Sequence, residues 1–114
     1  AGPNRNNGDV MGVPVRVPYG FNRAAVRNLR VAEDCPRVHA RHSRPQTMAQ
    51  WRAMGVTPID RSLRATDMAT LIEPDGPGQT AYLVTDNYRA ILKYNCSNFY
   101  ALSVALLANG IIGR

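Results

Sequence analysis

The chain has 114 residues, the length of one ordinary domain, and its 45% hydrophobic content excludes an intrinsically disordered protein. Its formal net charge is +6, and the surplus lies in residues 1–64, which hold eleven Arg against four Asp and Glu. This charge suits an anionic partner, but without a recognition motif it predicts solubility and weak nonspecific attraction rather than a function.

Targeting signals are not evident in the sequence. Residues 1–9 lack the apolar core of a signal peptide. The longest nearly apolar run, residues 99–108, is too short for the ~20 residues of a membrane span, so we expect no transmembrane segment. Because the chain does not begin with Met, we expect a processed or excised piece.

The N-terminal elements are predicted from short local patterns. Residues 1–12 are polar and rich in Gly and Asn, which indicates a linker or a disordered arm. In residues 13–18, Val alternates with other residues as in a half-buried strand, and the two prolines favour the edge of a sheet. Asn22 is a suitable N-cap for a short helix that we expect to continue to Leu29.

The middle of the chain predicts one helix and one β-hairpin. Residues 46–54 lie between a proline and a glycine, which are typical helix boundaries, and Trp51 should anchor a small core there. Residues 69–73 and 80–85 are strand-like and are joined by six residues rich in Pro and Gly. An antiparallel hairpin is the simplest connection between them.

Two helices are predicted near the C-terminus. The first begins near Asn87, with Thr85 or Asp86 as its cap, and has Tyr88, Ile91 and Leu92 on one face. The second, residues 98–109, is apolar on nearly all sides, and such a helix belongs inside a larger body. Because the preceding β-rich part can cover only some of this surface, further helices are implied.

His39 and His42 are the first candidates for a metal site. No further Cys or His cluster completes the four ligands of zinc, so we expect a solvated loop and no metal or cofactor. The surrounding basic residues 37–44 could bind nucleic-acid phosphates, but they lack interleaved aromatic side chains for base stacking. We expect no nucleic-acid partner, and a nucleic-acid-binding domain is the least favoured alternative.

Glu73 and Asp75, two positions apart, are the candidates for a catalytic pair of carboxylates such as glycosidases use. Pro74-Asp75-Gly76 is also a turn signature, and a hydrated hairpin tip does not raise the pKa of a carboxyl group as a general acid requires. The turn is the better interpretation, and we identify no catalytic residue in the chain.

The two cysteines, Cys35 and Cys96, leave two possibilities open. If they pair, closure of the loop between them would stabilise the fold by ~4 kcal/mol in the chain-entropy model. Two reduced and mostly buried thiols are at least as consistent with the sequence.

Polar and aromatic residues gather at the joint of the two C-terminal helices, in the run Tyr94-Asn95-Cys96-Ser97-Asn98-Phe99-Tyr100. The run is explained by a helix corner, because Ser97 or Asn98 is a good N-cap. It is explained equally well by a saccharide site, because Asn offers a donor and an acceptor while Tyr adds a flat apolar face and a hydroxyl.

These residues resemble the C-terminal signature of the membrane-bound lytic murein transglycosylase B family. That family typically has Phe-Leu-Val, Asn-Phe, Tyr-Asn-x-Ser and Tyr-Ala-x-x-Val in this order. The matching segments here are Tyr82-Leu83-Val84, Asn87-Tyr88, Tyr94-Asn95-Cys96-Ser97 and Tyr100-Ala101-Leu102-Ser103-Val104. The resemblance covers about Val13 to Ala108, with Tyr88 in place of the usual Phe and Asn109 where Asp is common.

The resemblance implies cleavage of the MurNAc–GlcNAc bond of peptidoglycan, with formation of 1,6-anhydro-MurNAc ends. In the family, one Glu in an upstream helical segment serves as acid and then as base, and that segment is absent here. The family's groove-lining residues carry over as substrate-binding residues onto Tyr94, Asn95 and Tyr100. The chain alone is therefore expected to bind glycan strands without cleaving them.

The expected fold is α+β, with a small antiparallel β-rich subdomain followed by C-terminal helices that belong to a lysozyme-like helical domain. Its expected parts are an arm at residues 1–12, the β-rich subdomain with short helices at 13–85, and the C-terminal helices at 86–114. The resemblance implies peptidoglycan and the enzyme's upstream catalytic segment as partners, in the periplasm or cell envelope. The alternative is a noncatalytic peptidoglycan-binding module or accessory subunit.

Overall fold

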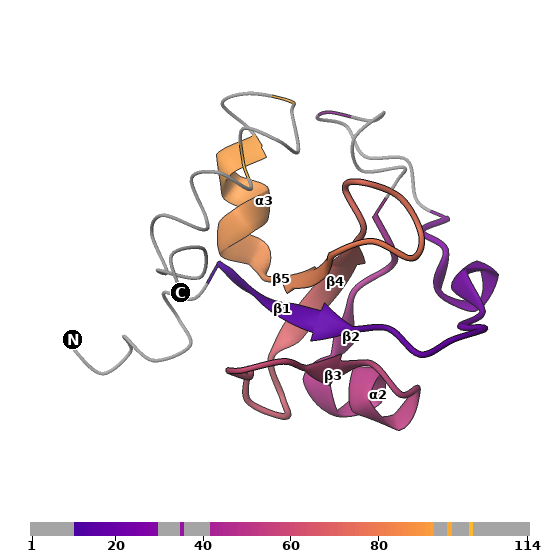
Figure 1. The fold of residues 1–114 in the computed structure, drawn as a ribbon. Coiled ribbons are helices and arrows are strands. Elements are labelled where there is room, and N and C mark those ends of the chain that lie inside the picture. The colour runs from indigo at the N-terminus through magenta and orange to yellow at the C-terminus, as the bar shows by residue number, and fades with distance from the viewer. Residues whose placement is uncertain (1–10, 30–34, 36–41, 93–95, 97–100, 102–114) are drawn as a thin grey trace.

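A computed structural model describes residues 11–29, 35, 42–92, 96 and 101 of the chain. Their centre is a five-stranded antiparallel sheet with the strand order β2-β4-β5-β1-β3 (Figure 1). The strands are β1 (Gly12–Arg16), β2 (Gln46–Thr47), β3 (Thr57–Pro58), β4 (Met68–Ile72) and β5 (Ala81–Val84). The described helices are the 3₁₀-helix η3 (Arg23–Val26), α2 (Met48–Ala53) and α3 (Asp86–Leu92). Helices α2 and α3 lie on opposite sides of the sheet (Figure 1).

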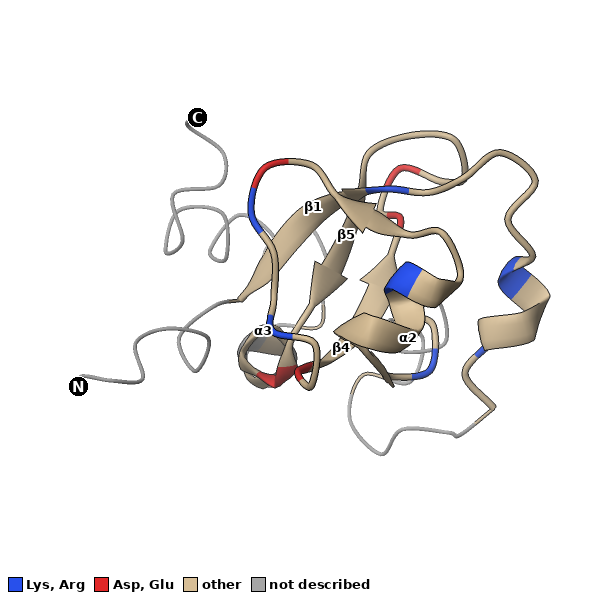
Figure 2. Cartoon of the chain, turned by 90° about the horizontal axis from the view of Figure 1, so that it is seen from below, with Lys and Arg blue, Asp and Glu red and all other residues tan. Residues whose placement is uncertain are grey.

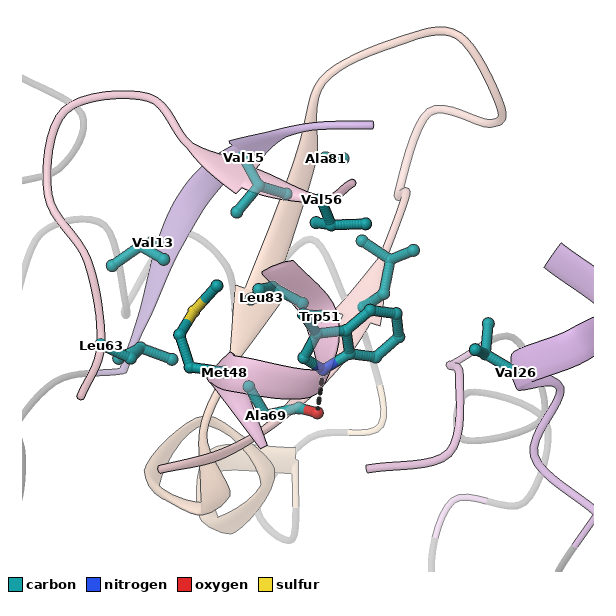
Figure 3. Close-up of a cluster of buried hydrophobic side chains, with 11 residues drawn as sticks. Val13, Val15, Val26, Met48, Trp51, Val56, Leu63, Ala69, Ala81 and Leu83 are labelled. Carbon is teal, nitrogen blue, oxygen red and sulfur yellow. Dashed lines mark hydrogen bonds between the residues drawn. The ribbon is translucent and has the colours of Figure 1, made fainter. Parts of the chain in front are cut away.

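The alternation of side chains along β5 divides the buried residues into two clusters. Ala81 and Leu83 belong to a cluster on the α2 side of the sheet, whereas Val84 packs with residues of α3 on the other side. The α2 side holds the larger core: Val13, Val15, Val26, Met48, Trp51, Val56, Leu63, Ala69, Leu71, Ala81 and Leu83 (Figure 3). The α3 side holds Cys35, Ile72, Val84, Tyr88, Leu92 and Ala101.

Helix α2 places Trp51 at the centre of the larger core, which confirms the predicted anchor. The indole is 0% exposed, and its N–H donates to the carbonyl of Ala69 in β4 at 2.9 Å (Figure 3). The helix starts at Met48 because Thr47 and Gln50 form a capping box. The predicted start at residue 46 was two residues early, since residues 46–47 pair with β4 as strand β2.

The predicted hairpin is confirmed, since β4 and β5 pair antiparallel with Leu71 opposite Leu83. Its connection turns at Gly76, whose φ is 100° and whose N–H donates to the carbonyl of Glu73 at 2.9 Å. The left-handed backbone at this position favours glycine, as the Pro-Asp-Gly turn signature predicted.

Strand β1 lies between β5 and β3, so the predicted edge position was wrong. Pro14 is accommodated because its carbonyl faces the two-residue strand β3 and accepts from Ile59 N–H at 3.1 Å. The N and C=O of one strand residue point to the same side, so the missing N–H of Pro14 also faces this short strand and not β5.

The predicted helix after Asn22 is much shorter than expected. Only Arg23–Val26 form a 3₁₀ turn, the Asn22 side chain makes no capping hydrogen bond, and Leu29 is 77% exposed. Val26 alone enters the larger core, because Arg27 already has extended backbone and bridges to Ser43.

Helix α3 begins as predicted, since the N–H of Asn87 donates to the Thr85 side chain at 3.3 Å. Its residues Tyr88 and Leu92 are both 0% exposed against the sheet. Beyond it, Cys96 forms a disulfide with Cys35, which settles the question that the sequence left open.

The antiparallel β-rich part of the α+β prediction is therefore confirmed. The helix predicted at residues 98–109 and most of the expected arm at residues 1–12 lie outside the described residues. Among the helices that the structure describes, none is long and apolar enough to cross a membrane.

Candidate functional site

A pocket of about 260 Å³ lies where η3, residues 42–43 and the end of β4 meet. Its walls combine small apolar side chains with charged and polar ones. The lining residues are Arg23, Ala24, Val26, Arg27, His42, Ser43, Leu71 and Glu73.

Hydrogen bonds of the backbone and of the Ser43 hydroxyl hold the three walls of this pocket together. Ser43 connects two of them: its N–H donates to the Leu71 carbonyl at 3.1 Å, and its hydroxyl accepts from Leu71 N–H at 2.8 Å. The third wall is joined through Arg44, whose N–H donates to the carbonyl of Val26 at 2.8 Å. The pocket is thus part of the folded framework rather than a gap between independent loops.

Arg23 and Glu73 form a bidentate ion pair at the pocket. Nε and Nη2 of Arg23 donate to the two carboxylate oxygens of Glu73 at 2.6 and 2.8 Å. The hydrogen bond to Glu73 raises the pKa of the Arg23 guanidinium above its usual value. Because both oxygens of Glu73 face the guanidinium, this carboxylate is not placed to protonate a substrate.

His42 is buried at 4% exposure, so the predicted solvated loop is wrong for this residue. Its ring lines the pocket and lies 6.3 Å, centroid to centroid, from the ring of Tyr88 in α3. His39 lies outside the described residues. Within the described part of the chain, no group of three His, Cys, Asp or Glu side chains could hold a metal ion.

The sequence-predicted groove residues Tyr94, Asn95 and Tyr100 lie outside the described residues. Their described neighbours are nonetheless fixed on both sides. Leu92 is buried at the end of α3, and Cys96 is covalently joined to Cys35, with 5.3 Å between the two Cα atoms.

Basic and acidic residues are interspersed in the described part of the chain. Figure 2 shows the described Arg residues spread around the outside of the fold, with acidic residues among them. Arg37 and Arg41 of the basic run lie outside the described residues, so the absence of a nucleic-acid partner stays a prediction.

The whole chain was then compared with known proteins. The family model described as the transglycosylase SLT domain matches residues 7–109. The chain belongs to the transglycosylase SLT domain family. The resemblance to lytic transglycosylases is thereby confirmed, while the membrane-bound B subtype stays a prediction.

Two solved structures of this family are similar to the chain. One is SltB3 from Pseudomonas aeruginosa in complex with NAG-anhNAM-pentapeptide, with 33% identity, a TM-score of 0.67 and 93% of this chain covered. The other is SltB3 in complex with NAG-NAM-pentapeptide, with 32% identity, a TM-score of 0.67 and 94% of this chain covered. In both cases the match covers 26% of the SltB3 chain. The 114-residue chain therefore spans about a quarter of the length of SltB3. No match was found among curated proteins.

The pocket was missed by sequence reasoning, which found no role for Arg23. The two halves of its ion pair are 50 positions apart, so no local spacing joins them. The family match, in contrast, follows from the short C-terminal motifs. These motifs predict the family without predicting which side chains form a pocket.

Proposed function

We propose that this chain forms the glycan-binding part of a lytic transglycosylase that cleaves the MurNAc–GlcNAc bond and leaves 1,6-anhydro-MurNAc ends. The observation that carries the proposal is the family match over residues 7–109, supported by 33% identity to SltB3. SltB3 has been seen with peptide-bearing NAG-NAM ligands, and we extend that substrate class, a glycan strand with attached peptides, to this chain. The proposed location is the periplasm or cell envelope.

Tyr94, Asn95 and Tyr100 are the proposed substrate-binding residues. Tyr supplies flat apolar faces on which sugar rings stack, and the Asn amide donates to and accepts from hydroxyl groups. The disulfide at Cys96 supports this role, because it restrains the chain next to Asn95 and so reduces the entropy lost when a ligand binds.

The catalytic Glu is proposed to come from another part of the enzyme. Among the described carboxylates, Glu73 is paired with Arg23 and Asp67 accepts from the N–H of Arg64, while Asp60, Asp75 and Asp86 are exposed. None lies in the apolar, water-excluded setting that makes a carboxyl group a general acid at neutral pH.

Pelleting with purified peptidoglycan sacculi tests the binding residues. Tyr94→Ala and Asn95→Ala should each weaken retention by about fivefold or more, as expected for loss of a hydrogen bond or stacking contact worth ~1 kcal/mol. Tyr19→Ala is the matched control, because Tyr19 is fully exposed on another part of the fold. Equal retention of all variants would exclude the proposed groove.

Product analysis separates the proposal from a noncatalytic peptidoglycan-binding module. That alternative is favoured by the absence of a suitably placed acid among the described carboxylates. The 114-residue chain should release no 1,6-anhydromuropeptides from sacculi, and a version extended by the helical segment that carries the Glu should release them. Release by the short chain would contradict an external acid, and none from the extended version would favour the binding module.

A further inference from the structure

The pocket at η3 has a composition that differs from that of a sugar groove. Its walls contain the apolar side chains of Ala24, Val26 and Leu71, together with two guanidinium groups and one carboxylate. Among the described lining residues there is no Tyr, Trp or Phe on which a sugar ring could stack, and the one ring, that of His42, is buried near Tyr88. The pocket therefore favours a ligand other than the glycan itself.

The described lining of the pocket has two Arg and one Glu, and this excess of positive charge favours an anionic ligand. Glu73 neutralises Arg23 through two hydrogen bonds at 2.6 and 2.8 Å. Arg27 also lines the pocket, is exposed, and forms no ion pair with any carboxylate of the described residues. An Arg side chain binds a carboxylate through two parallel N–H groups, so Arg27 can take a carboxylate that the protein does not supply.

The size of the pocket limits its ligand. Sites for drug-sized molecules usually measure about 300–1,000 Å³. A volume of about 260 Å³ is smaller, which suits one or two amino-acid residues with small side chains. Ala24 is exposed, whereas Val26 and Leu71 are 2% and 4% exposed, so the apolar surface open to a ligand is small and suits methyl groups. The exposed Arg27 end is suited to a carboxylate.

The pocket is also preorganised. Ser43 is tied to Leu71, and the residue after Ser43 is tied to Val26, by hydrogen bonds of 2.8 to 3.1 Å. The Arg23–Glu73 pair joins η3 to the end of β4 on a further side. A ligand that enters this framework does not have to order it, which lowers the entropic cost of binding.

We propose that this pocket binds the peptide attached to the glycan strand, with Arg27 pairing with a peptide carboxylate and the Ala24, Val26 and Leu71 wall contacting alanine methyl groups. The peptides of peptidoglycan carry both groups, with free carboxylates and several alanine residues. This inference rests on the proposed function for the identity of the ligand. It assigns the sugar and the peptide of one substrate to two different sets of residues.

Binding of the free pentapeptide, without sugar, tests the proposal by isothermal titration calorimetry on the 114-residue chain. Arg27→Gln removes the charge at an exposed position, and it should weaken peptide binding about tenfold or more, as expected for a lost charge-assisted hydrogen bond. Arg16→Gln is the matched control, because Arg16 is exposed on β1 and does not line the pocket. It should leave the affinity unchanged.

Two further ligands define the chemistry. The pentapeptide with all carboxylates amidated should bind at least about tenfold more weakly than the free acid. Inorganic phosphate should not compete at equal concentration, and competition by phosphate would overturn the proposal in favour of a general anion site. Equal binding of the peptide by Arg27→Gln and the unchanged chain would also overturn it.

Binding of glycan strands that carry no peptide is measured alongside, so that failure of the peptide pocket can be distinguished from failure of the proposed function. If the strands bind and the pentapeptide does not, the peptide pocket is wrong and the glycan groove stands. If the pentapeptide binds through Arg27 and the strands do not, the groove at Tyr94 and Asn95 is wrong. Near-ultraviolet circular dichroism of Trp51, which is buried in the main core, verifies that each variant is folded.

Discussion

Cys35 and Cys96 are joined by a disulfide although 61 positions separate them in the sequence. The bond attaches a residue of the α3-side cluster to the chain that follows α3. The sulfur of Cys35 also lies 3.1 Å from the carbonyl oxygen of Leu92, the last residue of α3. The disulfide therefore joins Cys96, four residues beyond the end of this helix, to the α3-side cluster.

Replacement of both cysteines, Cys35→Ala with Cys96→Ala, should lower the free energy of unfolding by ~4 kcal/mol, because the unfolded chain regains the entropy of a long open loop. Urea unfolding with and without a phosphine reductant measures the effect. The reductant should destabilise the unchanged chain by a similar amount and leave the double variant unaffected. If the reductant leaves the urea midpoint of the chain with both cysteines where it was, the disulfide has no structural role.

The Arg23–Glu73 ion pair should contribute much less. The Arg23 side chain is 37% exposed and that of Glu73 is 12% exposed, so solvent screens much of their attraction. A double-mutant cycle with Arg23→Ala and Glu73→Ala should give a coupling energy of about 0.5–1 kcal/mol in dilute buffer, decreasing in 1 M salt.

The same cycle on Arg64 and Asp67 provides the comparison. That pair is 3.4 Å apart, and Arg64 is 63% exposed, so its coupling should be smaller still. A coupling for Arg23 and Glu73 that exceeds ~2 kcal/mol, or that is insensitive to salt, would indicate a more deeply buried pair than the structure contains.

Local sequence signals predicted the parts of the fold that local interactions determine. The hairpin follows from strand-like residues on both sides of a Pro-Asp-Gly turn, and the start of α3 follows from the hydroxyl of Thr85. The capping box of Thr47 and Gln50 was also present in the sequence as a Thr and a Gln three positions apart. Its recognition would have placed the start of α2 correctly.

Features that depend on distant residues were not predicted. Two prolines indicated that β1 lies at the edge of the sheet. Strand β3 instead pairs with the side of β1 that faces away from β5, because the chain after α2 returns to Pro14 and Val15. A helix to Leu29 was expected after Asn22 as its N-cap, but the chain after Val26 pairs with Ser43 instead. The pocket depends on the pairing of the chain after Val26 with Ser43, which are far apart in the sequence, so no local motif predicts it.

Tyr88 should make the fold sensitive to alkaline pH. Burial raises the pKa of its phenol well above the usual value of 10.0. Above about pH 10 the unfolded chain loses this proton while the folded chain keeps it, so the unfolded state binds fewer protons and stability falls as pH rises. For one such group the free energy of unfolding decreases by up to about 1.4 kcal/mol per pH unit.

Urea unfolding between pH 8 and pH 11.5 measures this dependence. Tyr88→Phe should decrease the loss of stability above pH 10, because the phenylalanine ring fills the same site without a titrating group. Tyr82→Phe is the informative comparison: burial, and secondarily the charge of Asp75, raises the pKa of Tyr82 in the same direction, but this ring is only half-buried. Its replacement should therefore remove a smaller part of the slope. An identical slope in the unchanged chain and in Tyr88→Phe would mean that the Tyr88 phenol reaches water in the folded protein, which contradicts its 0% exposure.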